Sequence, residues 1–218
     1  PPPPPIFFYT HTPQTPTLRS LVGSEMCIRD RSMAPLMEDV GRLQPVLDHC
    51  MEFAMNAQSE TWADKLGLGG LQESDEELVN DLLVLLGSTE VDMTMFFRGL
   101  CSATEPDVDH LSAAFYEGNE PSKTAWNAWL TRWWERVDGQ PDRDTMRTAN
   151  PKYVLRNWMA QLAIDAAEQN NDFTVAEELH ELLKRPYDEQ PEHEERWFQK
   201  RPEWARHRVG CSMLSCSS

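Results

Sequence analysis

Long apolar runs and basic patches are both missing from this 218-residue sequence. No run approaches the ~20 apolar residues of a membrane-spanning helix, so we expect no membrane partner. Basic residues are scarce, with 20 Lys and Arg against 36 Asp and Glu, and the formal net charge is −16. A chain this acidic, without a Lys/Arg cluster, argues against nucleic acid or an anionic surface as partner.

Cysteine is also sparse, and its spacing is irregular. The five cysteines are Cys27, Cys50, Cys101, Cys211 and Cys216. An odd number at uneven intervals does not suit the disulfide framework of a secreted domain. We therefore expect a reducing compartment, such as the cytosol or an organelle matrix.

A recognisable nucleotide or metal site is a third absence. A kinase-like site needs a glycine-rich loop over the phosphates, a strand lysine, a catalytic-loop Asp with a following Asn, and a second Asp that binds metal. The glycines of residues 67–70 fit the end of a helix better, and the acidic loop 188–195 with His193 lacks the close carboxylate set of a metal site. We predict that this chain contains no catalytic residue and binds no cofactor or metal.

What the sequence does contain, from Met33 onward, is helical periodicity, which predicts an all-α fold. Helix starts are expected at Pro45, at Ser74 with a capping-box partner in Glu77, at Asp92 and at Ser122. Gly87 is expected just beyond the end of the second of these helices. The stripes predicted to face a core include Val46, Leu47, Cys50, Met51 and Phe53, then Phe96, Phe97 and Leu100, and then Trp126, Trp129, Leu130, Trp133 and Val137.

The strongest local signal lies in residues 150–167, which we predict to be one helix. Asn150 can cap it and Pro151 suits its first position. Arg156 and Asn157 interrupt the apolar run, so each should have a fixed partner, and structural hydrogen bonding is favoured over ligand contact. We expect most faces of this helix to be buried. The apolar residues expected on the buried faces are Val154, Leu155, Trp158, Met159, Leu162, Ala163 and Ala166.

Downstream, Asn170 and Asn171 predict a turn, and a second amphipathic helix should stop before Pro186 with His180 on its exposed side. The irregular region that follows can be anchored to the helical body by the aromatic rings of Trp197, Phe198 and Trp204, together with Pro202.

Residues 1–32 behave differently from the rest of the sequence. They open with five prolines and show no helical or strand periodicity. Residues 21–31 resemble a translated reading frame of a transposon-end sequencing adaptor, so we exclude 1–32 from functional reasoning; a disordered natural leader is the alternative. The expected organisation is an unstructured segment 1–32, a helical region 33–205 and a flexible cysteine-containing tail 206–218.

Four motifs in one order carry a family resemblance: NPKYVLRNWMAQLAIDAAE from Asn150, Arg185-Pro186-Tyr187, Arg201-Pro202-Glu203-Trp204 and Ser215-Cys216-Ser217-Ser218. They closely resemble the C-terminal part of selenoprotein O (SelO), a family of pseudokinase-fold protein adenylyltransferases. The resemblance covers roughly residues 43–218. It implies the helical C-terminal part of a protein-kinase-like fold, without the N-terminal portion that holds the nucleotide site.

The same resemblance implies what the full-length protein does. It would use ATP and Mg²⁺ or Mn²⁺ to transfer AMP to hydroxyl groups of protein substrates, and this chain alone would be inactive. Family members are mitochondrial in eukaryotes and cytoplasmic in bacteria. Cys216 takes the position of the family's terminal cysteine or selenocysteine, which implies a redox switch with a cysteine of the kinase-like body. Cys211 and Glu203 depart from the family pattern.

Two other classes of function stay open at this point. One is a non-catalytic helical module whose acidic surface and aromatic grooves bind a partner protein. The other is a thiol-redox protein that acts through Cys211 and Cys216, which could pair with each other or remain inert thiols.

Overall fold

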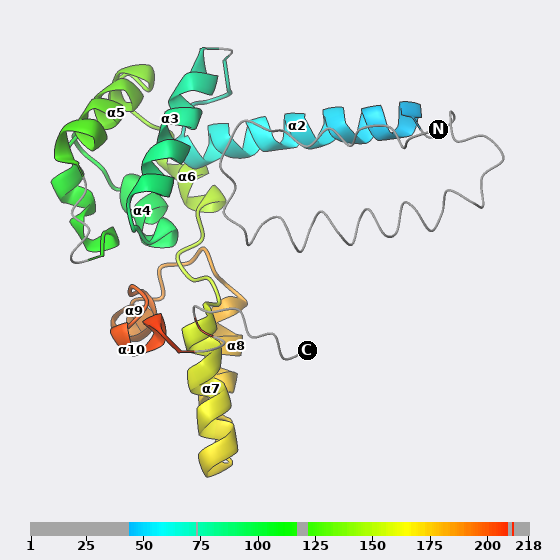
Figure 1. Cartoon of the computed structure of the whole chain (residues 1–218), viewed down its shortest axis with the longest axis vertical. Helices are drawn as coiled ribbons and strands as arrows, with labels where there is room; N and C mark the ends of the chain where they lie inside the picture. Colours follow the sequence, from blue (N-terminus) through cyan, green and yellow to red (C-terminus); the bar gives the residue numbers. More distant parts are fainter. Residues whose placement is uncertain (1–43, 73, 117–121, 209–210, 212–218) are drawn as a thin grey trace. The chain divides into compact units, whose positions relative to one another are not determined.

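The computed structural model describes residues 44–72, 74–116, 122–208 and 211, and these residues form helices joined by short loops (Figure 1). The elements are α2 Gln44–Leu66, α3 Asp75–Ser88, α4 Met93–Leu100, the 3-10 helix η3 Val108–Ala114, α5 Lys123–Arg136, α6 Arg143–Ala149, α7 Asn157–Asn170, α8 Thr174–Leu183, α9 Pro191–Trp197 and α10 Glu203–Arg206. Over these ranges the only strand-like pairing is an isolated bridge between Val91 and Phe115. The all-α prediction is confirmed for the described residues.

The chain divides into two compact units, Pro1–Met55 and Asn56–Ser218, with the boundary inside α2. The predicted segment 1–32 and most of the tail, including Cys216, lie outside the described residues. No helix within the described ranges is long and apolar enough to cross a membrane.

The described part of the first unit, residues 44–55, corrects one prediction. Cys50, Met51 and Phe53 were expected to face a core, but all three are exposed, Phe53 by 69%. The side chains of Val46 and Leu47 are outside the described residues. Periodicity identifies which face of a helix is apolar but not whether another element covers that face.

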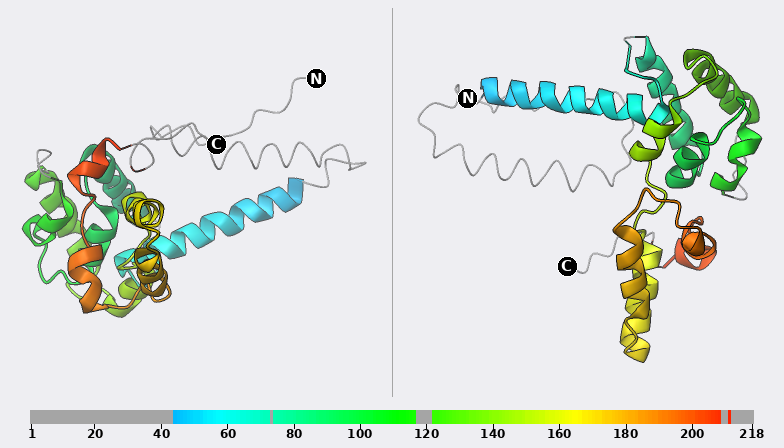
Figure 2. Two further views of the ribbon diagram at one scale, coloured as in Figure 1. Left: turned by 90° about the horizontal axis from the view of Figure 1, so that it is seen from below. Right: turned by 180° about the vertical axis from the view of Figure 1, so that it is seen from behind.

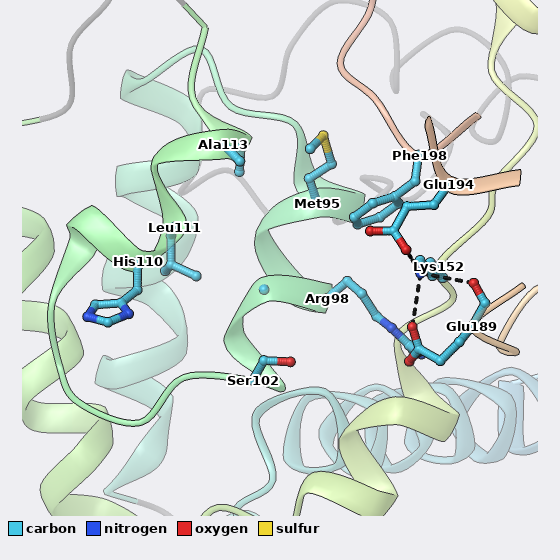
Figure 3. Close-up of a pocket in the computed structure, with 12 residues that line it drawn as sticks. Met95, Arg98, Ser102, His110, Leu111, Ala113, Lys152, Glu189, Glu194 and Phe198 are labelled. Atoms are coloured by element: carbon cyan, nitrogen blue, oxygen red, sulfur yellow. Dashed lines mark hydrogen bonds and ion pairs between the residues drawn. The ribbon is translucent and has the colours of Figure 1, made fainter. Parts of the chain in front are cut away.

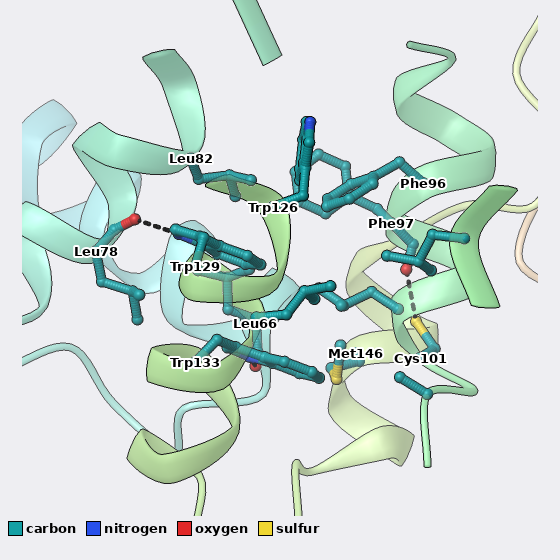
Figure 4. Packing of buried hydrophobic residues seen from close by; sticks show 14 of the residues in the cluster. Leu66, Leu78, Leu82, Phe96, Phe97, Cys101, Trp126, Trp129, Trp133 and Met146 are labelled. Carbon is teal, nitrogen blue, oxygen red and sulfur yellow. Dashed lines mark hydrogen bonds between the residues drawn. The ribbon is translucent and has the colours of Figure 1, made fainter. Parts of the chain in front are cut away.

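In the second unit, the first apolar cluster is built around the tryptophans of α5 (Figure 4). Trp126, Trp129 and Trp133 are buried, as the spacing predicted. The indole N–H of Trp129 donates to the carbonyl of Leu78 on α3 at 2.8 Å, and that of Trp133 donates to the carbonyl of Leu66 at 2.9 Å. The aromatic stripe is therefore packing, and its polar atoms tie α5 to α3 and to the end of α2.

Two helix starts that were predicted from a capping side chain are confirmed. Asp92 accepts a hydrogen bond from the backbone N–H of Met95 at the start of α4, and Ser122 accepts one from Ala125 at the start of α5. Gly67, at φ +64°, ends α2, and a Cβ placed there would lie 2.8 Å from the sulfur of Met146. Glycine is required at this turn by both backbone conformation and space.

The predicted ends of α3 are wrong in detail. Ser74 makes no capping hydrogen bond, and Gly87 lies inside the helix, which continues to Ser88. The carboxylate of Asp75 replaces the expected capping box. It accepts a hydrogen bond from the backbone N–H of Gln72 at 2.8 Å and forms an ion pair with the guanidinium of Arg136. A charged carboxylate binds a guanidinium more strongly than the neutral hydroxyl of Ser74 could.

The predicted helix over 150–167 begins later than expected. Asn150 is the residue that ends α6, and α7 starts only at Asn157. Between them, the N–H groups of Lys152 and Tyr153 both donate to the carbonyl of Pro186, at 2.8 and 3.0 Å. This distant acceptor holds the segment in a non-helical conformation, so the sequence rules for Asn and Pro at a helix start did not apply.

Burial along α7 is also narrower than predicted. Trp158 and Met159 are buried, but Leu155 is 52% exposed and Val154 is exposed. Leu155 and Val154 precede the helix, so they do not share its buried face.

The second apolar cluster joins α7, α8 and the region after them. α7 and α8 lie side by side in both views of Figure 2. The rings of Trp158 and Trp197 stack with their centroids 6.0 Å apart. The turn at Asn171 is left-handed and α8 ends before Pro186 with His180 exposed, as predicted. The cluster's buried members are Tyr153, Trp158, Met159, Leu179, Leu182, Trp197, Ala205 and Cys211.

The region after α8 is more regular than expected. Residues 191–197 form α9, although an acidic loop was predicted over 188–195. Trp197 is buried and serves as an anchor, whereas Trp204 is 43% exposed and does not.

Candidate functional site

The candidate site is a pocket of about 240 Å³ beside α4, shown in Figure 3 and called here the α4 pocket. One wall comes from α4 and η3, and the opposite wall comes from the segment before α7 and from the region around α9. The side chains that face one another across it include Met95, Arg98, His110, Lys152, Glu189 and Phe198.

Arg98 is a charged residue of the short apolar helix α4, and its side chain lines the pocket while being only 7% exposed. A buried guanidinium is costly unless its donors are used. Arg98 donates to the carbonyls of Arg147, Asn150 and Tyr187 at 3.0–3.1 Å, and to the carboxylate of Glu189. This one side chain therefore holds α4 to the end of α6 and to the loop after α8.

Lys152 faces Arg98 across the same carboxylate and is 4% exposed. Its ammonium group donates to the carbonyl and carboxylate of Glu189, both at 2.9 Å, and to the carboxylate of Glu194 at 2.8 Å. Burial favours loss of the proton, but the hydrogen bonds to Glu194 and Glu189 outweigh it, and the pKa of Lys152 is raised. Lys152 therefore stays protonated at neutral pH and is not a base.

A second pairing, between Asp92 and Arg156, lies behind the start of α4. The guanidinium of Arg156 donates to both carboxylate oxygens of Asp92, at 2.5 and 2.8 Å, while Asp92 also caps α4. The prediction that Arg156 has a fixed partner is confirmed. Asn157 is exposed, and the described residues offer its side chain no partner, so that half of the expectation stays a prediction.

In a third pairing, two arginines of the region after α9 share the carboxylate of Glu90. Arg201 donates to one carboxylate oxygen of Glu90 at 2.8 Å, and Arg206 donates to the other at 3.1 Å. The backbone N–H of Arg201 also donates to the hydroxyl of Tyr116 at 3.0 Å. Together with the two pairings above, this group forms what we call the ion-pair layer, which ties α10 and its preceding loop to the segments flanking α4.

The contacts of the ion-pair layer connect elements of the fold to one another. Each buried cation in it is held by a carboxylate, and no cluster of residues suited to a metal ion is present in the described ranges. His110, on the far side of the α4 pocket, is itself paired with Glu105 at 2.8 Å. The charged groups of this arrangement therefore pair with one another and fix elements in place.

The other residues singled out by sequence have scattered positions. Asn150 is buried, accepts from the ammonium of Lys65 at 3.0 Å and donates to the Lys65 carbonyl at 2.9 Å. Pro186 acts through its carbonyl, Arg185 pairs with Asp188 on the surface, and Pro202 precedes α10. Cys211 is buried in the second cluster, and whether it pairs with Cys216, which lies outside the described residues, stays open.

Sequence reasoning did not single out Arg98, Lys152, Glu189 and Glu194 as one group. A weak signal existed, since Arg98 and Lys152 both interrupt apolar runs. Their partners lie 91 and 37 residues further along the chain, and no local pattern could pair them.

A model of the family described as protein adenylyltransferase SelO matches residues 25–184, which is most of the chain. The chain belongs to the SelO family. The matched region contains Arg98, Lys152 and Arg156 of the ion-pair layer. It begins within the segment 1–32, whose interpretation as an adaptor stays a prediction.

Relatives named protein nucleotidyltransferase YdiU support this assignment. The one from Flavobacterium johnsoniae is 42% identical over 197 residues, covering 84% of this chain and 37% of the relative. One from Xanthomonas campestris is 44% identical over 197 residues, covering 86% and 38%, and one from Rhodopirellula baltica is 40% identical over 234 residues, covering 96% and 42%. This SelO-family chain thus spans about two fifths of the length of these protein nucleotidyltransferases.

Proposed function

We propose that this chain is the helical C-terminal portion of a SelO-type protein adenylyltransferase. In the full-length protein, AMP would pass from ATP to Ser, Thr or Tyr hydroxyls of protein substrates, and the portion not spanned by this chain would provide the kinase-like nucleotide site. Family membership and the order of the four sequence motifs support this proposal.

The observation that carries the proposal is how the charged residues of the α4 pocket, and of the Asp92–Arg156 pair behind it, are used. Adenylyl transfer needs cations and metal ligands aimed at phosphate oxygens. Arg98, Lys152 and Arg156 are instead committed to Glu189, Glu194 and Asp92. The described residues do not fit a divalent ion, so we assign ATP and Mg²⁺ or Mn²⁺ to the rest of the full-length protein.

Two other functions have less support. A thiol-redox role needs an accessible Cys211, but this residue is only 7% exposed. A free-standing interaction module would account for exposed apolar residues such as Met51 and Phe53. It would not account for the family motifs, whereas a portion that packs against the rest of a larger enzyme accounts for both.

The test compares the chain alone with the chain in a full-length context. We expect no transfer of labelled AMP from ATP, with Mg²⁺ or Mn²⁺, to any protein by the purified 218-residue chain. A chimera in which this chain replaces the matching part of the Flavobacterium johnsoniae relative should restore transfer, with that relative as the positive control. Labelling by the chain alone, or a folded chimera that stays inactive beside an active relative, would refute the proposal.

A further inference from the structure

An apolar groove of about 310 Å³ lies between the end of α2, the start of α4 and the segment that follows α6. We call it the α2–α4 groove. Trp62, Phe97 and Pro151 line it together with Met93 and Val154, which are 51% and 40% exposed. Every lining residue belongs to the unit Asn56–Ser218. The groove therefore presents apolar side chains to solvent although nothing in the described chain fills it.

The charged residue that lines the groove is Lys65, in the last turn of α2. Its ammonium donates to the amide oxygen of Asn150 at 3.0 Å and lies 4.8 Å from the centroid of the Phe97 ring. Burial lowers the pKa of Lys65, and a smaller effect of Cys101 opposes that shift. The ring and the amide compensate the half-buried charge only in part.

The half-buried Lys65 differs from the buried Lys152 in the partners of its ammonium group. Lys152 has the carboxylates of Glu189 and Glu194 within 2.9 Å, whereas no carboxylate of the described residues lies within ion-pair distance of Lys65. This is notable in a chain with 36 acidic residues. An apolar groove with one cation that has no carboxylate partner among the described residues fits a partner that brings both an apolar side chain and a carboxylate.

We propose that the α2–α4 groove seats an apolar segment of the SelO polypeptide from outside this chain, and that the segment carries an Asp or Glu that pairs with Lys65. The proposal rests on the proposed function, because the curated relatives are more than twice as long as the part that this chain matches. A segment tethered in the same polypeptide has a high effective concentration at the groove. A second copy of this chain, also at −16, would be repelled.

Two readouts on the same chimera test the proposal, with the isolated chain as reference. Hydroxyl-radical footprinting should show Met93 oxidised several-fold more slowly in the chimera than in the isolated chain. Phe173, 55% exposed after α7 and away from the groove lining, is the matched control and should react equally in both. Competitive acetylation across a pH series should show that the pKa of Lys65 rises in the chimera, because a carboxylate stabilises the charged form.

Each outcome decides a part of the proposal. Equal oxidation of Met93 in both proteins excludes docking at the groove, and a protected Met93 without a raised Lys65 pKa excludes the carboxylate. Protection of Met93 in the isolated chain that grows with protein concentration would identify a second copy as the occupant. An active chimera with a reactive Met93 rejects only this inference, whereas a protected Met93 in an inactive chimera rejects only the proposed function. If the first chimera does not fold, one with the Xanthomonas campestris relative takes its place.

Discussion

Asp92 combines two tasks at the scale of a single residue. One oxygen caps α4, and both oxygens receive the guanidinium of Arg156. Both side chains are largely buried, at 7% and 14% exposure. When one member of a buried pair loses its charge, the other is left uncompensated, which costs far more than the loss of a surface pair.

The substitution Asp92→Asn separates these tasks, because an amide oxygen still caps the helix but carries no charge. We expect it to lower the free energy of unfolding by about 3–5 kcal/mol in urea denaturation. The matched control is Asp81→Asn, which removes the half-exposed pair with Arg132 and should cost about 0–1 kcal/mol. Equal losses for the two variants would mean that Arg156 finds solvent or another partner when Asp92 is neutral.

The role of a side chain could be predicted from sequence where its partner lies within a few residues along the chain. Asp92 and Ser122 were identified as caps because their partners lie three residues away. Arg156 was predicted to have a partner because a guanidinium in an apolar run must be compensated. The identity of that partner, 64 residues earlier, follows only from the packing of α4 against the segment before α7.

At the scale of elements, α7 shows how a distant group overrides local signals. The sequence from Asn150 onward favours a helix start, but the carbonyl of Pro186 takes two N–H groups and delays it to Asn157. The periodicity still identified Trp158 correctly as core, since Trp158 and Met159 lie on the helical side of the new boundary. Helix type was thus predictable, whereas its first turn depended on a loop more than thirty residues away.

Trp158 of α7 stacks on Trp197 of α9 inside the second apolar cluster. Trp158→Ala should lower the free energy of unfolding by about 3–5 kcal/mol, because a large buried ring is replaced by a cavity. Trp204→Ala is the control, and for this 43% exposed ring we expect a change within about 1 kcal/mol. If the Trp158→Ala protein melts within a degree or two of the parent, Trp158 is not part of the core.

The junction of α3 and α5 should make stability depend on acidity. Burial raises the pKa of Asp75, but hydrogen bonds from Arg136 and Gln72 lower it more, so its pKa lies below the ordinary 3.8. A depressed pKa means that the stabilising contribution is complete above that ordinary value and is lost as the pH falls through the folded-state pKa.

Asp75→Asn should therefore cost about 2–3 kcal/mol at neutral pH, and this difference from the parent should shrink as the pH drops below about 4. The measurement is urea unfolding of both proteins across a pH series. Glu76→Gln changes the exposed neighbour in the same first turn and should give a small difference at neutral pH, within about 1 kcal/mol. A difference between the parent and Asp75→Asn that stays constant into strong acid would contradict the role of the Asp75 carboxylate.

At the scale of the whole molecule, two electrostatic effects oppose each other. The cations Arg98, Lys152 and Arg156 of the ion-pair layer are at most 14% exposed, which limits the screening of their ion pairs by salt. The net charge of −16, in contrast, produces repulsion over the entire chain. Repulsion is stronger in the compact state than in the unfolded one, because the charges are closer together. The local ion pairs therefore stabilise the folded state, whereas the excess of negative charge seen in the composition destabilises it.

Added salt should consequently stabilise this protein. Between about 0.01 and 0.15 M NaCl the Debye length falls from roughly 30 to 8 Å, so long-range repulsion is screened before the buried pairs weaken. We expect Tm to rise by about 2–4 °C, corresponding to roughly 1 kcal/mol for a chain of this size. Thermal unfolding followed by circular dichroism in NaCl is the measurement, and sucrose at matched osmolality controls for solvent exclusion. A Tm that falls with NaCl would mean that exposed pairs such as Arg132 with Asp81 outweigh the net charge.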